Sequence, residues 1–146
     1  MMRSIPTACL RLATLAAVCT AAPAAAQADS AALVTVLGRD TLALERWVRT
    51  PERVTAEAVV RSPRTTYRRY VLDLAPDGRM RRFEERTFDP ANTAGAPLRT
   101  DVYEAADSGW TRTLSQGDSV VTARVAAPAR SLPWVDLVHW PFELVL

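Results

Sequence analysis

Apolar and polar side chains alternate in short runs through most of the chain, and turn residues separate the runs. Because successive side chains of a strand point to opposite faces, this alternation is typical of β strands with one dry and one wet face. The clearest run is 54–62, in which Val54, Ala56, Ala58 and Val60 fall on one side. The pattern predicts strands at residues 32–37, 41–50, 54–62, 67–74, 80–88, 99–105, 110–115 and 119–126.

The run 41–50 is less regular than the others. Its apolar face is expected to hold Leu42, Leu44 and Val48. Glu45 and Arg49 then take the wet face, and Arg46 and Trp47 interrupt the alternation, so a bulge is expected there. Across all the runs the wet faces are strongly polar, which predicts that only one side of the sheet needs a cover.

Short turns join the predicted strands. The strongest is 75–78, where Pro76 presets its backbone angle and Gly78 accepts a positive φ, and the longest loop is 89–98. No apolar pattern of helical length separates the strands, which argues against a parallel sheet with crossover helices. We therefore predict a mainly β fold, an antiparallel meander that forms one curved open sheet or half-barrel. A closed barrel and a sandwich remain as alternatives.

The C-terminal segment 131–146 has a different pattern. Ser131 suits the N-cap of a helix and Pro133 its first turn, and a short helix is expected to end before Trp140 because Pro141 follows. The residues at helical spacing are Trp134, Leu137 and Val138. The residues after Pro141 alternate as a final strand would. The chain ends on an apolar residue, which leaves open that it is the truncated part of a longer protein.

Residues 1–28 have the features of a secretory signal peptide. Arg3 and Arg11 supply positive charge near the start, and the apolar run 12–26 follows. This run is short and rich in alanine, whereas a transmembrane helix needs roughly 20 strongly apolar residues. The pattern therefore predicts export, to the periplasm or the medium, and no transmembrane segment once the leader is removed.

Small residues define two cleavage sites, after Ala26 and after Ala28. The remainder, 29–146, is expected to be a single β-rich domain. A lipoprotein would instead keep Cys19 as its first residue, but Val18 before it departs from the small residue usual at that position.

Removal of the leader changes the composition. The full chain has a formal net charge of +2, but all acidic residues lie at or after Asp29, so the loss of Arg3 and Arg11 leaves a neutral domain. This balance gives no reason to expect nucleic-acid binding. Both cysteines, Cys9 and Cys19, lie in the leader, so the exported domain has no disulfide, thiol nucleophile or thiolate metal site.

Two groups of residues are candidates for ligand binding. Tryptophans could line an apolar groove on the inner face of the sheet, or they could be ordinary core residues. Eight arginines between Arg61 and Arg86 could form an anion site, or they could be a solvated face of cross-strand ion pairs. The candidates taken from these groups are Trp47, Trp110, Trp134, Trp140, Arg68 and Arg82.

One pair resembles catalytic machinery. Asp136 and His139 are three positions apart, and on a helix they would be neighbours, as a carboxylate-oriented general base requires. A nucleophile motif is missing, and a single histidine cannot make a histidine-rich metal site. We therefore expect no catalytic residues, metal or cofactor.

The sequence thus favours an exported, non-catalytic binding or carrier domain of the bacterial envelope, with a lipid or other apolar or amphiphilic small molecule as its ligand. An envelope protein–protein interaction domain is the alternative, and a hydrolase that uses Asp136 and His139 is the third.

Overall fold

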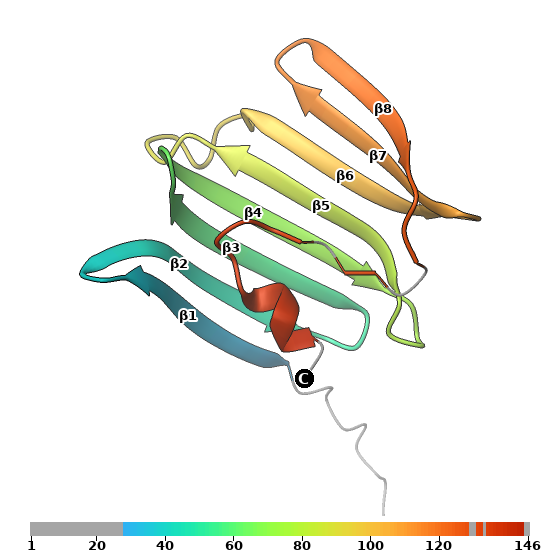
Figure 1. Ribbon diagram of the computed structural model, residues 1–146, viewed down its shortest axis with the longest axis horizontal. Coiled ribbons are helices and arrows are strands. Elements are labelled where there is room, and N and C mark those ends of the chain that lie inside the picture. Colours follow the sequence, from blue (N-terminus) through green and yellow to red (C-terminus); the bar gives the residue numbers. More distant parts are fainter. Residues whose placement is uncertain (1–27, 129–130, 133, 145–146) are drawn as a thin grey trace, which may run out of the picture.

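A computed structural model describes residues 28–128, 131–132 and 134–144 of the chain. Eight antiparallel strands form one sheet in which every strand pairs with its neighbours in sequence, from β1 to β8 (Figure 1). The strands are β1 (Asp29–Leu37), β2 (Asp40–Arg49), β3 (Arg53–Arg61), β4 (Thr65–Leu74), β5 (Met80–Phe88), β6 (Arg99–Ala106), β7 (Gly109–Gln116) and β8 (Ser119–Val125). The predicted antiparallel meander is confirmed, and its sheet is open: among the described residues β1 and β8 are its edges, and it does not curl toward a barrel.

The C-terminal segment 131–144 covers one face of the sheet. After β8 the chain returns across β5 and β4 and ends in a short 3-10 helix, η1 (Trp140–Leu144), in front of β2 and β3 (Figure 1). We call this side the covered face and the opposite side the bare face. The core lies between the covered face and the segment, and its largest fully buried side chains are Trp140, Tyr70, Leu72, Val54, Val60 and Val138.

The alternation of β3 and β4 predicted their faces correctly. Val54, Ala56, Ala58 and Val60 of β3 are all buried on the covered face. In β4, the buried side chains are Tyr70, Leu72 and Leu74. These two central strands supply much of the apolar floor on which the C-terminal segment packs.

The face prediction for β2 was wrong. Glu45 and Trp47 are buried on the covered face, whereas Leu44 and Val48 are exposed on the bare face. Glu45 is tolerated inside because its carboxylate accepts main-chain hydrogen bonds from the C-terminal segment. The register of β2 with β3 runs without a break through residues 46–47, and the shift in β2 lies instead opposite Thr35 and Val36 of β1.

The predicted C-terminal helix and final strand were also wrong in position. Residues 134–139 are not helical, and Leu137 has a φ of 60°, which no right-handed helix contains. The 3-10 helix begins instead at Trp140 and takes Pro141 into its first turn, where the missing N–H of proline costs no hydrogen bond. Residues 142–144 therefore belong to η1 and not to a strand, and 145–146 lie outside the described residues.

The predicted signal peptide lies outside the described residues except for Ala28, and β1 begins directly after it at Asp29. Within the part of the chain that the structure describes, no helix has the length and hydropathy to span a membrane.

Candidate functional site

An apolar row crosses the bare face from β1 to β5. Five residues that are partners in the register of neighbouring strands form it, and we call them the apolar row: Val34, Leu44, Val59, Tyr67 and Phe88. The outward faces of the strands were predicted to be strongly polar, and this row is an exception. The reason is the orientation of β2, which turns Leu44 outward between Val34 and Val59.

The first three members of the row are open to solvent. The exposed fractions are 60% for Val34, 50% for Leu44 and 39% for Val59. Together with Tyr67 they line a shallow apolar hollow of about 300 Å³ over β1 to β4. Ligand pockets start at roughly this volume, and contiguous exposed apolar surface on a soluble domain marks a site of interaction.

A row of charged residues runs beside the apolar row, two residues further along each strand and therefore about 7 Å away. Its members on β2, β3 and β4 are Arg46, Glu57 and Arg69, and they are partners in the register. Glu57 Oε2 lies 2.5 Å from an Arg46 guanidinium nitrogen, and Glu57 Oε1 lies 3.9 Å from Arg69 Nε. We call these three residues the charged row.

Arg69 connects the two rows. Its guanidinium lies 5.2 Å from the centre of the Tyr67 ring and 5.0 Å from that of Phe88, so it covers the inner end of the apolar row. Phe88 is only 3% exposed, whereas the outer end of the row stays open. Arg46, on β2 beside the open part of the row, is paired with Glu57, yet its side chain is 75% exposed.

Two basic groups share one carboxylate in the charged row. Burial by itself would raise the pKa of Glu57, but hydrogen bonds from Arg46 and Tyr67 and the charge of Arg69 outweigh it and hold the pKa below its ordinary value. Glu57 is therefore ionised at neutral pH, and the three side chains together have one positive charge left over. An apolar hollow with one net positive charge at its rim fits an amphiphile with an anionic group.

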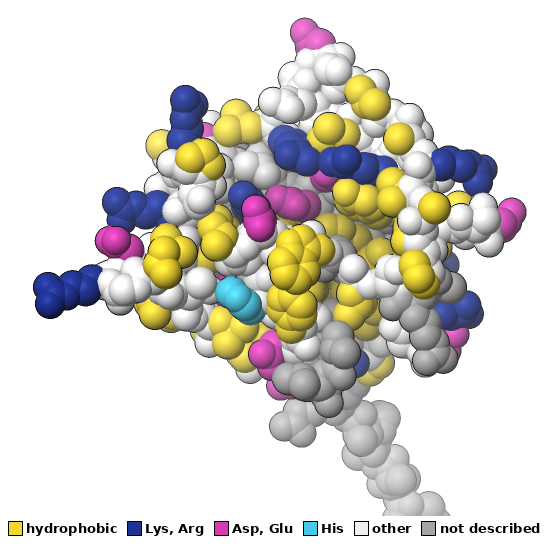
Figure 2. All heavy atoms as spheres, viewed as in Figure 1, with side chains coloured by type: hydrophobic (Ala, Val, Ile, Leu, Met, Phe, Trp, Pro, Cys, Tyr) yellow, Lys and Arg dark blue, Asp and Glu magenta, His cyan; other side chains and the backbone are white. Residues whose placement is uncertain are grey.

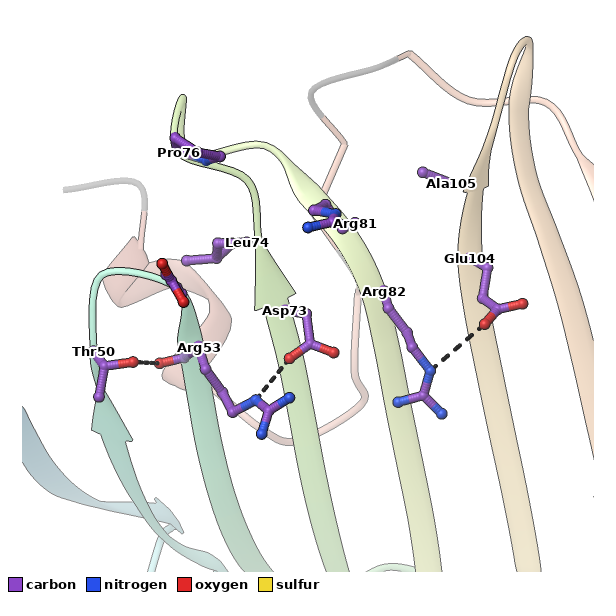
Figure 3. A pocket seen from close by; sticks show the side chains of 10 residues that line it. Thr50, Arg53, Asp73, Leu74, Pro76, Arg81, Arg82, Glu104 and Ala105 are labelled. Carbon is purple, nitrogen blue, oxygen red and sulfur yellow. Dashed lines mark hydrogen bonds and ion pairs between the residues drawn. The ribbon is translucent and has the colours of Figure 1, made fainter.

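Arg82 lies at the other end of the bare face, in an open groove of about 990 Å³ (Figure 3). Two ion pairs cross the floor of this groove, Arg53 with Asp73 at 2.7 Å and Arg82 with Glu104 at 3.7 Å. Arg82 also contacts the carboxylate of Glu84. Since Arg53 and Arg82 already have acidic partners on neighbouring strands, the predicted candidate Arg82 belongs here to a cross-strand ion pair.

Three of the four candidate tryptophans lie in the core. Trp47, Trp110 and Trp140 are at most 5% exposed and belong to one cluster on the covered face. Trp134 is 77% exposed and packs edge-on against Phe142, 5.4 Å between ring centres. The predicted tryptophan groove is thus occupied by the C-terminal segment of the chain itself.

Arg68, the remaining candidate, belongs to a charged cluster on the covered face that also contains Glu85, Arg99, Asp101 and Arg112. Figure 2 shows basic and acidic side chains gathered on this face beside the apolar groups at its centre. We call these five residues the covered-face cluster.

The two carboxylates of the covered-face cluster have opposite environments. Asp101 accepts hydrogen bonds from Arg112 at 2.9 and 2.6 Å and from Arg99 at 2.8 Å, and these outweigh its burial and lower its pKa. Burial raises the pKa of Glu85, and the neighbouring charge of Asp101 adds to the effect. The positive charge of Arg68 lowers the pKa of Glu85, but it lies 3.5 Å away and does not outweigh these two effects. Neighbouring acids whose pKa values are shifted in opposite directions are typical of functional sites.

His139 has different neighbours from those predicted. The helix that would place Asp136 beside it is not formed, and its Nδ1 lies 3.0 Å from Thr35 Oγ1 and 3.4 Å from Glu45 Oε1. Both contacts hold the C-terminal segment on the sheet. The described part of the chain contains no group of three or more potential metal ligands.

Sequence reasoning missed both the apolar row and the pairing of Glu85 with Asp101. Each depends on the register between strands, which joins residues that no spacing along the chain relates. The turn at 75–78 joins β4 to β5. It was the signal that could have set the register of these two strands and so placed Tyr67 opposite Phe88.

No protein-family model, curated protein or solved structure matches this chain. The site must therefore be interpreted from its own geometry.

Proposed function

We propose that this chain is an exported, non-catalytic domain that binds an amphiphilic molecule on its bare face. The apolar part of the ligand lies over the apolar row, and its anionic group lies at the charged row. The observation that carries the proposal is the exposure of Val34, Leu44 and Val59 in one continuous row.

The covered face supports this choice by elimination. The tryptophans that would have bound an apolar ligand there already pack against the C-terminal segment. A ligand on the bare face displaces only water. At about 25 cal/mol for each Å² of apolar surface, covering the hollow is a favourable contribution to binding.

A titration with a dansyl-labelled undecanoic acid tests the proposal. We expect dansyl emission to rise and shift to shorter wavelength on binding, and unlabelled laurate to displace the probe. Val34→Asp should weaken binding at least tenfold, because a charge in the row opposes apolar contact; tenfold corresponds to about 1.4 kcal/mol. Val121→Asp is the matched control, since Val121 is 55% exposed on β8, the other edge strand.

The charged row predicts a preference among headgroups. Arg46→Gln should weaken the binding of laurate severalfold and leave that of dodecanol unchanged, because only laurate has a charge to lose. Binding that is insensitive to both Val34→Asp and Arg46→Gln would exclude this site.

Export is tested separately. The full chain is expressed in a Gram-negative host, and the N-terminus of the recovered protein is determined by mass spectrometry. We expect it to begin at Gln27 or Asp29. Since β1 begins at Asp29, either cleavage leaves the sheet whole. Protein that keeps Met1 and stays inside the cell would contradict export.

A protein partner is the second candidate, and the free edge of β1 favours it. This strand has one charged residue, Asp29, and neither proline nor arginine to block pairing with another chain. Sedimentation of the pure protein separates the two functions. Concentration-dependent association that laurate does not reverse would favour the edge, whereas a monomer that binds laurate favours the amphiphile.

A further inference from the structure

The two carboxylates of the covered-face cluster differ in their hydrogen bonds. Asp101 is held by two arginines, whereas Glu85, its partner across β5 and β6, has no hydrogen bond from any residue that the structure describes. The contact between Glu85 and Arg68 is a loose one, at 3.5 Å. Both side chains are partly open to solvent, with 21% and 18% exposed.

Tyr70 adds a donor to the same place. It is the partner of Glu85 in the register of β4 with β5, and only 1% of the residue is exposed. Its hydroxyl is buried and has no hydrogen-bond partner among the described residues. A buried hydroxyl without a partner costs roughly 1–3 kcal/mol, so an acceptor brought to it is bound favourably.

The geometry points to a small-carboxylate site at Arg68, Tyr70 and Glu85, which takes up a proton on Glu85 when the ligand binds. The Arg68 guanidinium and the Tyr70 hydroxyl donate to the carboxylate of the ligand. A protonated Glu85 donates a third hydrogen bond, whereas an ionised Glu85 repels the ligand.

The groups around Glu85 favour the uptake of a proton by its carboxylate. The charged and titratable groups that face it are Arg68 and Tyr70 from β4, Arg99 and Asp101 from β6, and Arg112 from β7. Burial and Asp101 already raise the pKa of Glu85, and an anion placed beside it raises the pKa further. Once Glu85 is neutral, three arginines face one remaining carboxylate, and the cluster has an excess of positive charge.

This site is independent of the one on the bare face. Arg68 and Tyr70 point to the covered face, whereas Tyr67 and Arg69 of the same strand belong to the bare face. The Val34→Asp variant, which removes the amphiphile site, is therefore expected to bind small carboxylates normally.

Calorimetric titration of the exported protein with acetate is the test, made in two buffers that differ in ionisation enthalpy. We expect uptake of about one proton for each acetate bound above the pKa of Glu85, and an affinity that falls by up to tenfold for each pH unit there. Inorganic phosphate is expected to bind less well. Binding without proton uptake, or phosphate binding as tight as that of acetate, would overturn the assignment.

Three variants and a control locate the site. Arg68→Gln should lower the acetate affinity at least tenfold, and Tyr70→Phe severalfold without loss of stability, because it removes only the buried hydroxyl. Glu85→Gln should bind acetate without proton uptake and with little pH dependence. Arg81→Gln is the control, since Arg81 is exposed and lines the separate groove that also contains Arg53 and Arg82. If Arg68→Gln behaves like Arg81→Gln, the site is not there.

Discussion

The carboxylate of Glu45 accepts a hydrogen bond from the main-chain N–H of Trp140 at 3.0 Å, across 95 positions of the sequence. The N–H of His139 donates to the same carboxylate at 2.9 Å, so one acidic side chain of β2 satisfies two main-chain donors at the start of η1. The side chain of Glu45 is fully buried. This contact fixes where the C-terminal segment ends its path across the covered face.

Replacement of Glu45 should therefore detach the end of the segment. We expect Glu45→Ala to lower the free energy of unfolding by about 3 kcal/mol, because the buried N–H of Trp140 and the partly buried N–H of His139 lose their acceptor. Urea unfolding followed by tryptophan emission measures the change. Glu143→Ala, which removes an exposed carboxylate of η1, should change it by less than about 0.5 kcal/mol. If Glu45→Ala lowered the free energy of unfolding no more than Glu143→Ala, the contact would not contribute to stability.

The tryptophans provide a second, independent measure of the cover. Trp140 is fully buried and packs against Tyr70, 5.7 Å between ring centres, whereas Trp134 is 77% exposed. Trp140→Ala should destabilise the fold by about 3–5 kcal/mol. Trp134→Ala, which is the matched control, should cost less than about 1 kcal/mol. If thermal unfolding gives the same midpoint for both variants, the side chain of Trp140 is not part of the core.

The strands of this fold could be predicted because their alternation is local. In β3 four small apolar residues occur at every second position, and no other arrangement buries them together. In β2 the two faces have similar apolar content, because Leu44 and Val48 lie on one face and Trp47 lies on the other with Glu45. What decides between them is the contact of Glu45 with the C-terminal segment, and a local pattern has no information on it.

The candidate site was harder to predict for the same reason. An apolar row needs five strands in register, and a shift of one residue in any of them would turn its member to the other face. Arg68 was among the candidates from the sequence, but Glu85 and Tyr70 become its neighbours only through the pairing of β4 with β5. Sequence patterns predict which residues alternate, and long-range pairing determines which of them meet.

His139 has a structural role that a double-mutant cycle can test. Its Nδ1 lies 3.0 Å from Thr35 Oγ1, which ties the C-terminal segment to the edge strand β1. We expect Thr35→Val and His139→Ala to show a coupling of about 0.5–1.5 kcal/mol in the free energy of unfolding. Asp136→Ala and His139→Ala should be additive within about 0.5 kcal/mol. A strong coupling of His139 with Asp136 would instead revive the general-base pair that the sequence suggested.

Asp101 should make the stability of the domain depend on pH in the acidic range. Hydrogen bonds from Arg112 and Arg99 outweigh burial and leave its pKa below the ordinary value in the folded state. A depressed pKa contributes stability that is present above the pKa of the unfolded chain, about 3.9, and is lost as the pH falls through the folded value.

We therefore expect Asp101→Asn to lower the free energy of unfolding by about 2 kcal/mol at pH 7. The difference from the unmodified protein should shrink steadily below about pH 4, because protonation then removes the charge of Asp101 in the unmodified protein as well. Urea unfolding at intervals between pH 7 and pH 3 measures it, with Asp118→Asn in the exposed β7–β8 turn as the control. A difference that stayed constant across this range would mean that the arginines stabilise Asp101 through packing and not through its charge.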